Sequence, residues 1–361
     1  MIEKPLTIRE KKVLCVSLCY PLMKEKDLAK LLGLKLSTYT VIKRRLRNRG
    51  YFKKIRTPCL FKMGFDVFVV IYADISVIDD LLEEDVRNLL QELQFGSFSF
   101  LSRRHLLVLG FALDYASAVT DYIKLKEFLR ERSGRDELKV SMKVFPRQHS
   151  AILNFFNLGP SLADFWEFGK LKKEPKRICG MEVSSERPVM SNMGIEAFRA
   201  LISHPTMKDS DISALLKTSR QVVNKYKKSF EELGYLTTLG ITDPVKLGME
   251  VLSARWITYV DRGEGDLLKR LGKVCLKTSQ YFMIAGPEQI FTLSLYPDLT
   301  TLEVDEAGFL KALGEEGIKV IETDYRILSL PDSAQPTFFE FKKAADTIMV
   351  RGCRRRTRRK Q

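Results

Sequence analysis

Two segments of the chain carry side chains of the types that contact DNA. Residues 218–236 read TSRQVVNKYKKSFEELGYL, in which apolar residues recur at the 3.6-residue period of a helix and polar residues occupy the opposite face. In a helix that enters the major groove, arginine can bind guanine, asparagine or glutamine can bind adenine, and lysine can bind phosphate. The residues expected to contact DNA here are Arg220, Gln221, Asn224, Lys225 and Lys228.

A related segment, KLSTYTVIKRRLRNRGYF, occupies residues 35–52. From Lys35 to Arg56 there are nine Lys or Arg residues and no acidic residue, which suits the neutralisation of phosphates. The residues expected to contact DNA are, in the helix, Ser37, Thr40, Arg44, Arg45 and Arg47, and, in the wing that follows, Lys53, Lys54 and Arg56. The other wing, LTTLGITD, has no basic residue, so the first copy is expected to contribute more affinity and the second more base selection.

Enzymatic chemistry finds little support in the spacing of reactive residues. His105, His149 and His204 have no carboxylate or cysteine partner nearby in the sequence, and no phosphate-binding loop or dinucleotide glycine motif occurs. His105 follows Arg103 and Arg104, where an anion or ligand site is one option, but the turn composition favours a solvated hairpin. The six cysteines lack the spacing of a zinc site or a disulfide framework. We therefore expect no enzymatic activity, no catalytic residue, no cofactor and no metal.

The elements that position the DNA-contacting segments occur twice. A shift of 184 residues superposes Gly50 on Gly234 and Lys62 on Lys246, and the register holds without a gap through most of the repeat. A repeat of this length is hard to obtain by chance. The chain is therefore interpreted as an internal duplication of a unit of about 145 residues.

Each repeat is expected to begin with short helices and to continue with alternating strands and helices. In the second repeat the helices are predicted in MGIEAFRALISH, in KDSDISALL and after the N-cap Ser219, followed by a stop at Gly234 and a short hairpin in YLTTLGITD. This is the order of a winged helix-turn-helix. The rest of each repeat has the strand-helix-strand-strand-helix-strand order of a ferredoxin-like domain.

The predicted fold class is thus α+β, with two winged helix-turn-helix domains, each followed by a ferredoxin-like βαββαβ domain. The expected boundaries are 1–60 and 61–148 for the first pair of domains, 149–190 for a connector, 191–244 and 245–330 for the second pair, and 331–361 for a C-terminal segment with a basic tail. Both faces of the strand at 67–73 are apolar, so another sheet is expected to cover the face that helices leave open. That sheet belongs either to the other repeat or to a second chain. A homodimer through the ferredoxin-like sheets is the expected assembly.

The net charge of +15 indicates a polyanionic partner, either nucleic acid or an anionic membrane surface. Part of this charge lies in the tail RGCRRRTRRKQ at 351–361. The N-terminus has no signal-peptide pattern and no apolar run has the length of a membrane helix, so a cytoplasmic protein with no membrane partner is expected. Double-stranded DNA is the expected partner.

The segments LRNRGYF…FKMGFDVFVVIYADI and FEELGYL…VKLGMEVLSARWITYV resemble the junction of recognition helix, wing and first sheet strand in the Lrp/AsnC family of feast/famine transcriptional regulators. The resemblance implies a sequence-specific DNA-binding regulator with dimerising, ligand-sensing ferredoxin-like domains, and it leaves a small-molecule effector open. The same domain plan is also similar to siroheme decarboxylases, which implies a tetrapyrrole cleft lined by basic and histidine residues. A partner-binding scaffold without DNA affinity is the third alternative.

Overall fold

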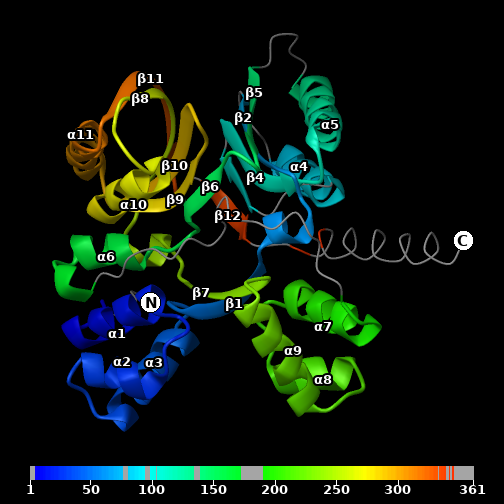
Figure 1. Ribbon diagram of the computed structural model, residues 1–361, viewed down its shortest axis with the longest axis vertical. Coiled ribbons are helices and arrows are strands. Elements are labelled where there is room, and N and C mark those ends of the chain that lie inside the picture. The colour runs from blue at the N-terminus through cyan, green and yellow to red at the C-terminus, as the bar shows by residue number, and fades with distance from the viewer. Residues whose placement is uncertain are drawn as a thin grey trace, which may run out of the picture. The chain divides into compact units, whose positions relative to one another are not determined.

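The computed structural model describes residues 5–75, 80–93, 98–102, 104–133, 139–171, 190–331, 333–338, 341 and 344 (Figure 1). The described chain mixes helices and strands and forms two compact units. The first unit combines Met1–Ile55, Ala151–Gly180 and Thr238–Pro331, and the second combines Arg56–Ser150, Met181–Thr237 and Asp332–Gln361. The expected basic tail at 351–361 and residues 172–189 of the expected connector lie outside the described residues.

The first unit begins with the helices α1 (Ile8–Cys19), α2 (Glu25–Leu31) and α3 (Leu36–Asn48). A capping box starts α1, because the Thr7 hydroxyl accepts a hydrogen bond from the Glu10 amide while the Glu10 carboxylate accepts one from the Thr7 amide. The residue before α3, Lys35, offers no side-chain cap. Tyr39 of α3 is fully buried, and Gly50 follows the helix at a φ of 77°, which a glycine adopts without strain.

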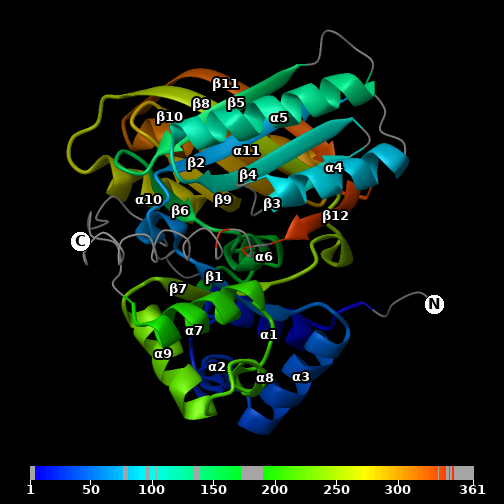
Figure 2. The same ribbon diagram turned by 90° about the vertical axis from the view of Figure 1, so that its right-hand side faces the viewer.

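The second unit contains the corresponding helices α7 (Asn192–Ser203), α8 (Asp209–Leu215) and α9 (Arg220–Glu232), which pack together in Figures 1 and 2. The predicted N-cap of α9 is confirmed, since the Ser219 hydroxyl accepts a hydrogen bond from the Val222 amide at 3.3 Å. Val223 and Phe230 are buried, and Gly234 ends the segment with a φ of 67°. The helical period of the sequence thus located the buried side of α9.

The strand β1 (Lys53–Pro58) follows α3, and the strand β7 (Leu236–Ile241) follows α9. The hairpin expected in the segment YLTTLGITD does not form, because a single strand occupies it and none of its residues takes the positive φ that a tight hairpin turn uses. Instead, β1 and β7 make a two-stranded sheet.

Short 3₁₀ turns after these strands bring a lysine to the end of each third helix. The turns are η1 (Leu60–Met63) and η3 (Val245–Leu247). Lys62 Nζ donates a hydrogen bond to the Leu233 carbonyl at 3.1 Å in the second unit, and Lys246 Nζ donates one to the Arg49 carbonyl at 3.1 Å in the first. A cation at the C-terminus of a helix interacts favourably with its unpaired carbonyls. Each lysine therefore caps the third helix of the other repeat.

The sheet of the second unit is built from β2 (Val67–Asp74), β3 (Phe98–Ser102), β4 (His105–Ala112) and β5 (Val140–Pro146), with the helices α4 (Asp80–Glu92) and α5 (Tyr115–Ser133). Figure 2 shows both helices over one face of this sheet. Alternate residues such as Val69 and Ile71 join a buried cluster with Val86 of α4 and Leu125 of α5. The residues between them, including Tyr72, are also buried, as the doubly apolar pattern of this strand predicted.

The sheet of the first unit is built from β8 (Val251–Asp261), β9 (Gln280–Ala285), β10 (Gln289–Tyr296) and β11 (Ile318–Ser329), with α10 (Leu267–Lys277) and α11 (Leu299–Glu315) on one face (Figure 1). Ile257, Leu271, Phe309 and Leu313 belong to its buried cluster. The elements of the described chain from α1 to β5 therefore recur in the same order from α7 to β11.

Each sheet gains a fifth strand within the described residues. The strand β6 (Ala151–Asn154) pairs with β9, and the strand β12 (Ser333–Phe338) pairs with β3. The strand β6, which follows the elements α1 to β5, thus extends the sheet of the first unit. The strand β12, which follows the elements α7 to β11, extends the sheet of the second unit. Both strands cover edges that would otherwise offer unpaired backbone groups. Neither strand was expected from the sequence pattern.

The helix α6 (Gly159–Phe165) and the 3₁₀ turn η2 (Gly169–Leu171) pack against α1 in the first unit. Their contact includes Cys15 and Cys19 of α1, with Trp166 and Phe168 at its rim. The helices approach closely at Gly159, where an added Cβ would lie 2.7 Å from the Cys19 amide nitrogen. No helix in the part of the chain that the structure describes is both long and apolar enough to cross a membrane.

Candidate functional site

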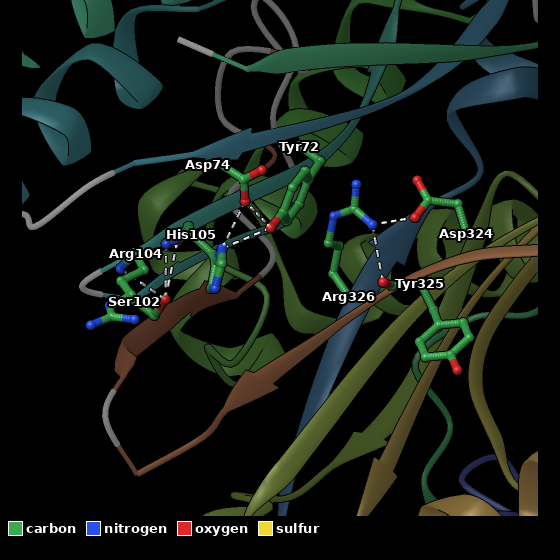
Figure 3. A network of polar contacts seen from close by, with 8 residues as sticks. All are labelled: Tyr72, Asp74, Ser102, Arg104, His105, Asp324, Tyr325 and Arg326. Atoms are coloured by element: carbon green, nitrogen blue, oxygen red, sulfur yellow. Dashed lines mark hydrogen bonds and ion pairs between the residues drawn. The ribbon is translucent and has the colours of Figure 1, made fainter. Parts of the chain in front are cut away.

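A tyrosine, an aspartate and a histidine meet at one end of the second unit's sheet (Figure 3). The Tyr72 hydroxyl donates a hydrogen bond to Oδ1 of Asp74 at 2.5 Å and lies 2.7 Å from Nδ1 of His105. Nδ1 of His105 lies 3.2 Å from Oδ1 of Asp74, and the Tyr72 and His105 rings stack with centroids 5.8 Å apart. The side chain of His105 is 29% exposed and that of Asp74 is 42% exposed, so solvent reaches the cluster.

The sheet register brings these residues together. Asp74 at the end of β2 pairs directly with His105 at the start of β4, and Tyr72 precedes Asp74 by two residues on the same face. The Ser102 hydroxyl orders the turn before β4, because it accepts hydrogen bonds from the amides of Arg104 and His105 at 3.4 and 3.1 Å. The position of the imidazole is therefore set by both strands and by the turn.

The hydrogen bonds around His105 fit a neutral imidazole that carries its proton on Nδ1. A tyrosine hydroxyl has one hydrogen, which Tyr72 gives to Asp74, so Nδ1 of His105 acts as the donor toward Tyr72 and Asp74. Nε2 then carries the lone pair, and it has no hydrogen-bond partner among the described residues. An imidazole oriented in this way by a carboxylate can accept a proton or bind a metal through Nε2.

The turn composition favoured a solvated hairpin at His105, and no carboxylate partner was found close to it in the sequence. The structure corrects this interpretation: Asp74 is the partner, 31 residues before the histidine. Strand pairing creates the contact, so only a prediction of the register between β2 and β4 could have found it. Within the described ranges, no group of three or more His, Cys, Asp or Glu residues could hold a metal ion by itself.

Figure 3 also shows a polar group on β11 of the first unit. Arg326 forms an ion pair with Asp324 and donates a hydrogen bond to the Tyr325 carbonyl at 3.1 Å. Arg326 was not among the residues singled out from the sequence.

The predicted DNA-contacting residues of α3, namely Ser37, Thr40, Arg44, Arg45 and Arg47, are all exposed. Two of them have acidic neighbours in the same unit. Arg45 lies 3.2 Å from Glu10, and the Thr40 hydroxyl donates to Glu25 at 3.3 Å. Over the residues described, Arg44 and Arg47 have no ion-pair partner.

The predicted residues of α9, namely Arg220, Gln221, Asn224, Lys225 and Lys228, are likewise exposed. None of them has a side-chain partner in the described ranges. On the same helix Lys227 pairs with Asp209 of α8 at 3.0 Å, which ties the helix to its neighbour without using the predicted residues. The structure therefore presents two polar helix faces.

The wing residues of the first repeat do not behave alike. Lys53 is exposed, and Lys54 is half-buried and donates to the Pro21 carbonyl at 2.6 Å. Arg56 is buried, so its predicted role in DNA contact is wrong. Its guanidinium pairs with Asp209 at 3.0 Å and donates to the carbonyls of Leu201, His204 and Met207, all in the second unit. A buried arginine needs such partners, and they make it unavailable to phosphate.

Comparison with known proteins found similar solved structures. No protein-family model matches the chain. No curated protein matches it either. The crystal structure of the siroheme decarboxylase NirDL is similar over 94% of this chain and 98% of its own, with 12% identity and a TM-score of 0.47. Its complex with an iron-uroporphyrin III analogue is similar over 95% and 98%, with 12% identity and a TM-score of 0.46.

Shorter matches include an AsnC family transcriptional regulator from Agrobacterium tumefaciens, which covers 38% of this chain and 90% of its own, at 16% identity and a TM-score of 0.29. The expectation that the chain is not an enzyme is corrected by these comparisons, because the chains similar to it over nearly its full length belong to a decarboxylase. At the level of fold, the chain is similar both to this enzyme and to Lrp/AsnC regulators.

Proposed function

We propose that the chain is a decarboxylase that acts on a carboxylate-bearing iron tetrapyrrole, the substrate class named for NirDL. The observation that supports the proposal is the geometry of His105, whose Nδ1 is held by Asp74 and Tyr72 while Nε2 remains a half-exposed acceptor. A neutral imidazole nitrogen is a common ligand of haem iron, and a carboxylate on its other nitrogen orients the ring.

In this proposal each residue of the cluster has its own task. His105 binds the iron of the substrate through Nε2, and Asp74 keeps the proton on Nδ1 so that this lone pair faces outward. The exposed Arg104, at the turn that Ser102 orders, is a donor for a substrate carboxylate. In the reaction a carbon–carbon bond breaks, carbon dioxide leaves, and a proton takes its place on the remaining carbon.

The experiment is a titration of the purified protein with iron-uroporphyrin III, followed by its visible absorption band and by mass spectrometry of the extracted tetrapyrrole. The wild type is expected to shift the band and to release carbon dioxide, whereas His105→Ala is expected to lose the ligand-dependent shift. His149→Ala, at an exposed position, is the matched control. An unchanged band with the wild type, or an identical shift with His105→Ala, would contradict the proposal.

We also infer that the chain is an internal duplication of a winged helix-turn-helix followed by a ferredoxin-like domain. Two features support it: the gapless shift of 184 residues through most of the repeat, and the recurrence of the same order of elements from α1 to β5 and from α7 to β11. The equivalent capping contacts of Lys62 and Lys246 agree with this interpretation.

A second candidate function is sequence-specific DNA binding of the regulator type, with or without a small-molecule effector and as a homodimer. It is favoured by the exposed faces of α3 and α9, where Arg44, Arg47 and Arg220 have no ion-pair partner among the described residues. Arginine at such positions can contact phosphate or guanine in a groove.

Binding of labelled random duplexes at two salt concentrations tests this second function. Arg44→Ala with Arg47→Ala is expected to weaken binding to all sequences and to lower the salt slope, because each lost phosphate contact releases about one counterion fewer. Arg220→Ala is expected to relax preference at particular base pairs by about 1–3 kcal/mol. The idea fails if the wild type binds no duplex at low salt.

A further inference from the structure

A buried arginine lies between the sheet and α11 of the first unit with its hydrogen-bonding groups unused. Arg255 of β8 is 1% exposed, and Nε, Nη1 and Nη2 all lack a hydrogen-bond partner in the part of the chain described. Glu306 of α11 comes no closer to Nε than 3.9 Å. The Phe309 ring lies 4.7 Å from the guanidinium, which provides a π face but no acceptor. A guanidinium buried with no acceptor would be strongly destabilising.

The neighbouring strands add further unused groups on the same side of the sheet. Thr292 of β10 pairs directly with Arg255 in the register and is 1% exposed, and its hydroxyl is unpartnered over the described chain. The Gln280 amide accepts from the Ser294 hydroxyl at 2.9 Å, yet its Nε2 is unpartnered. Guanidinium and amide nitrogens are donors only, and a hydroxyl can also donate. The group that complements them must therefore be rich in acceptors.

In the second unit's sheet, apolar residues occupy the two positions equivalent to Arg255 and Thr292. The shift of 184 residues takes Arg255 to Ile71 and Thr292 to Val108, and these two residues also pair directly in their own sheet. Ile71 and Val108 belong to the buried apolar cluster beneath α4 and α5. The fold therefore does not require polar residues at this location, and the polar set is a particular property of the first unit.

We propose that the buried, unpartnered side chains of Arg255, Thr292 and Gln280 form an internal binding site for a small oxyanion, carried by a carboxylate or a phosphate group. The Nη1 and Nη2 edge of Arg255 would hold two ligand oxygens in parallel, which is the geometry that a guanidinium fork favours. Thr292 and Gln280 would donate to the remaining lone pairs. Glu306, 17% exposed, lies toward the Nε edge at 3.9 Å. This site is separate from His105, and it does not depend on the function proposed above.

The test is a thermal-unfolding titration of the full chain with acetate in one arm and inorganic phosphate in the other, each matched to sodium chloride at equal ionic strength. A ligand that binds the folded state is expected to raise the midpoint by roughly 2 °C or more at saturating concentration. The ¹⁵N signal of Arg255 Nε is expected to shift in the same arm. A response to acetate alone identifies a carboxylate ligand, and a response to phosphate alone identifies a phosphate ligand.

The decisive variant is Arg255→Ile with Thr292→Val, which places at these positions the residue types found at Ile71 and Val108 in the other sheet. It is expected to fold, since Ile71 and Val108 fill the same positions, and to lose the response. Thr292→Val alone keeps the guanidinium and is expected to weaken binding roughly three- to tenfold. Arg262→Met, at an exposed arginine, is expected to respond like the wild type. The proposal is overturned if neither anion moves the midpoint or the Arg255 signal, or if a crystal structure soaked in both shows only water on the guanidinium.

Discussion

The guanidinium of Arg56 is buried in the second unit. It connects β1 to the end of α7 and the start of α8 through three carbonyls and the Asp209 carboxylate. Lys227 of α9 pairs with the other oxygen of the same carboxylate at 3.0 Å. The two cations therefore share one acid, and α7, α8 and α9 are positioned around it.

Replacing Arg56 with methionine is expected to destabilise the second unit by about 3–5 kcal/mol, because it removes one partner of a buried ion pair and leaves carbonyls without donors. Chemical unfolding followed by circular dichroism measures the loss. Lys53→Met on the same strand, where the side chain is exposed, is expected to change stability by less than about 0.5 kcal/mol. Equal effects of both substitutions would show that Arg56 contributes no more than a surface residue.

The sequence could not assign Arg56 correctly. It lies in a basic run with Lys53 and Lys54, and composition alone treats all three as exposed cations. Its partner Asp209 is 153 residues away, so the ion pair depends on packing between segments that no local pattern relates. His105 was missed for the same reason. By contrast, the helical period correctly separated the exposed residues of α9 from the buried Val223 and Phe230.

At the scale of elements, Arg270 joins β8, α10 and the end of α11. Its Nη2 donates to both carboxylate oxygens of Asp261, each at 2.7 Å, and its Nη1 donates to the Glu316 carbonyl at 2.6 Å. Gly263 lies so close that an added Cβ would clash with this guanidinium. The hydrogen bond from Arg270 holds the pKa of Asp261 below its usual range.

This lowered pKa predicts an acid-dependent loss of stability. The contribution of Asp261 is fully present above the unfolded-state pKa near 3.8 and is lost as the pH falls through the lower folded-state value. Unfolding measured from pH 7 to pH 3 is expected to show a shallower decline below about pH 4 in Asp261→Asn than in the wild type. Asp211→Asn, at an exposed carboxylate, is expected to keep the wild-type slope. Parallel wild-type and Asp261→Asn curves would rule out this linkage.

Most elements were predictable from period and capping, and their partners were not. The order β3-β4-β2-β5 agrees with the ferredoxin-like arrangement expected from the sequence. The strands β6 and β12 escaped prediction because four and six residues give too little alternation to identify a strand. In β12, Pro336 further weakens the pattern, although proline is tolerated in an edge strand.

At the scale of the whole molecule, the exchanged edge strands make each sheet depend on a distant part of the chain. The strand β12 contributes four registered pairs with β3, which include Phe338 opposite Phe98. Without β12, β3 would present an open edge of unpaired backbone groups. Such an edge invites pairing with other chains.

A chain ending at Pro331 is therefore expected to lose roughly 1–4 kcal/mol of stability, at about 0.2–1 kcal/mol for each of the four lost pairs, and to aggregate more readily. Urea unfolding and light scattering measure the two effects. A chain ending at residue 350 keeps β12 and lacks only 351–361, so it controls for the loss of basic charge. If both truncations behave alike, β12 does not protect the sheet.

Each compact unit combines segments that are far apart in the sequence, and this determines when the unit can form during translation. The first unit needs both Met1–Ile55 and Thr238–Pro331. A ribosome that adds about 5–20 residues per second requires roughly ten seconds or longer to make the intervening chain. Until Gly240 has been made, Phe52 lacks its packing contact with that residue. In the same way, the Cys15 thiol has no Gly159 carbonyl to contact until Gly159 has been made. The packing of the first unit can therefore be completed only after Thr238–Pro331 has been made.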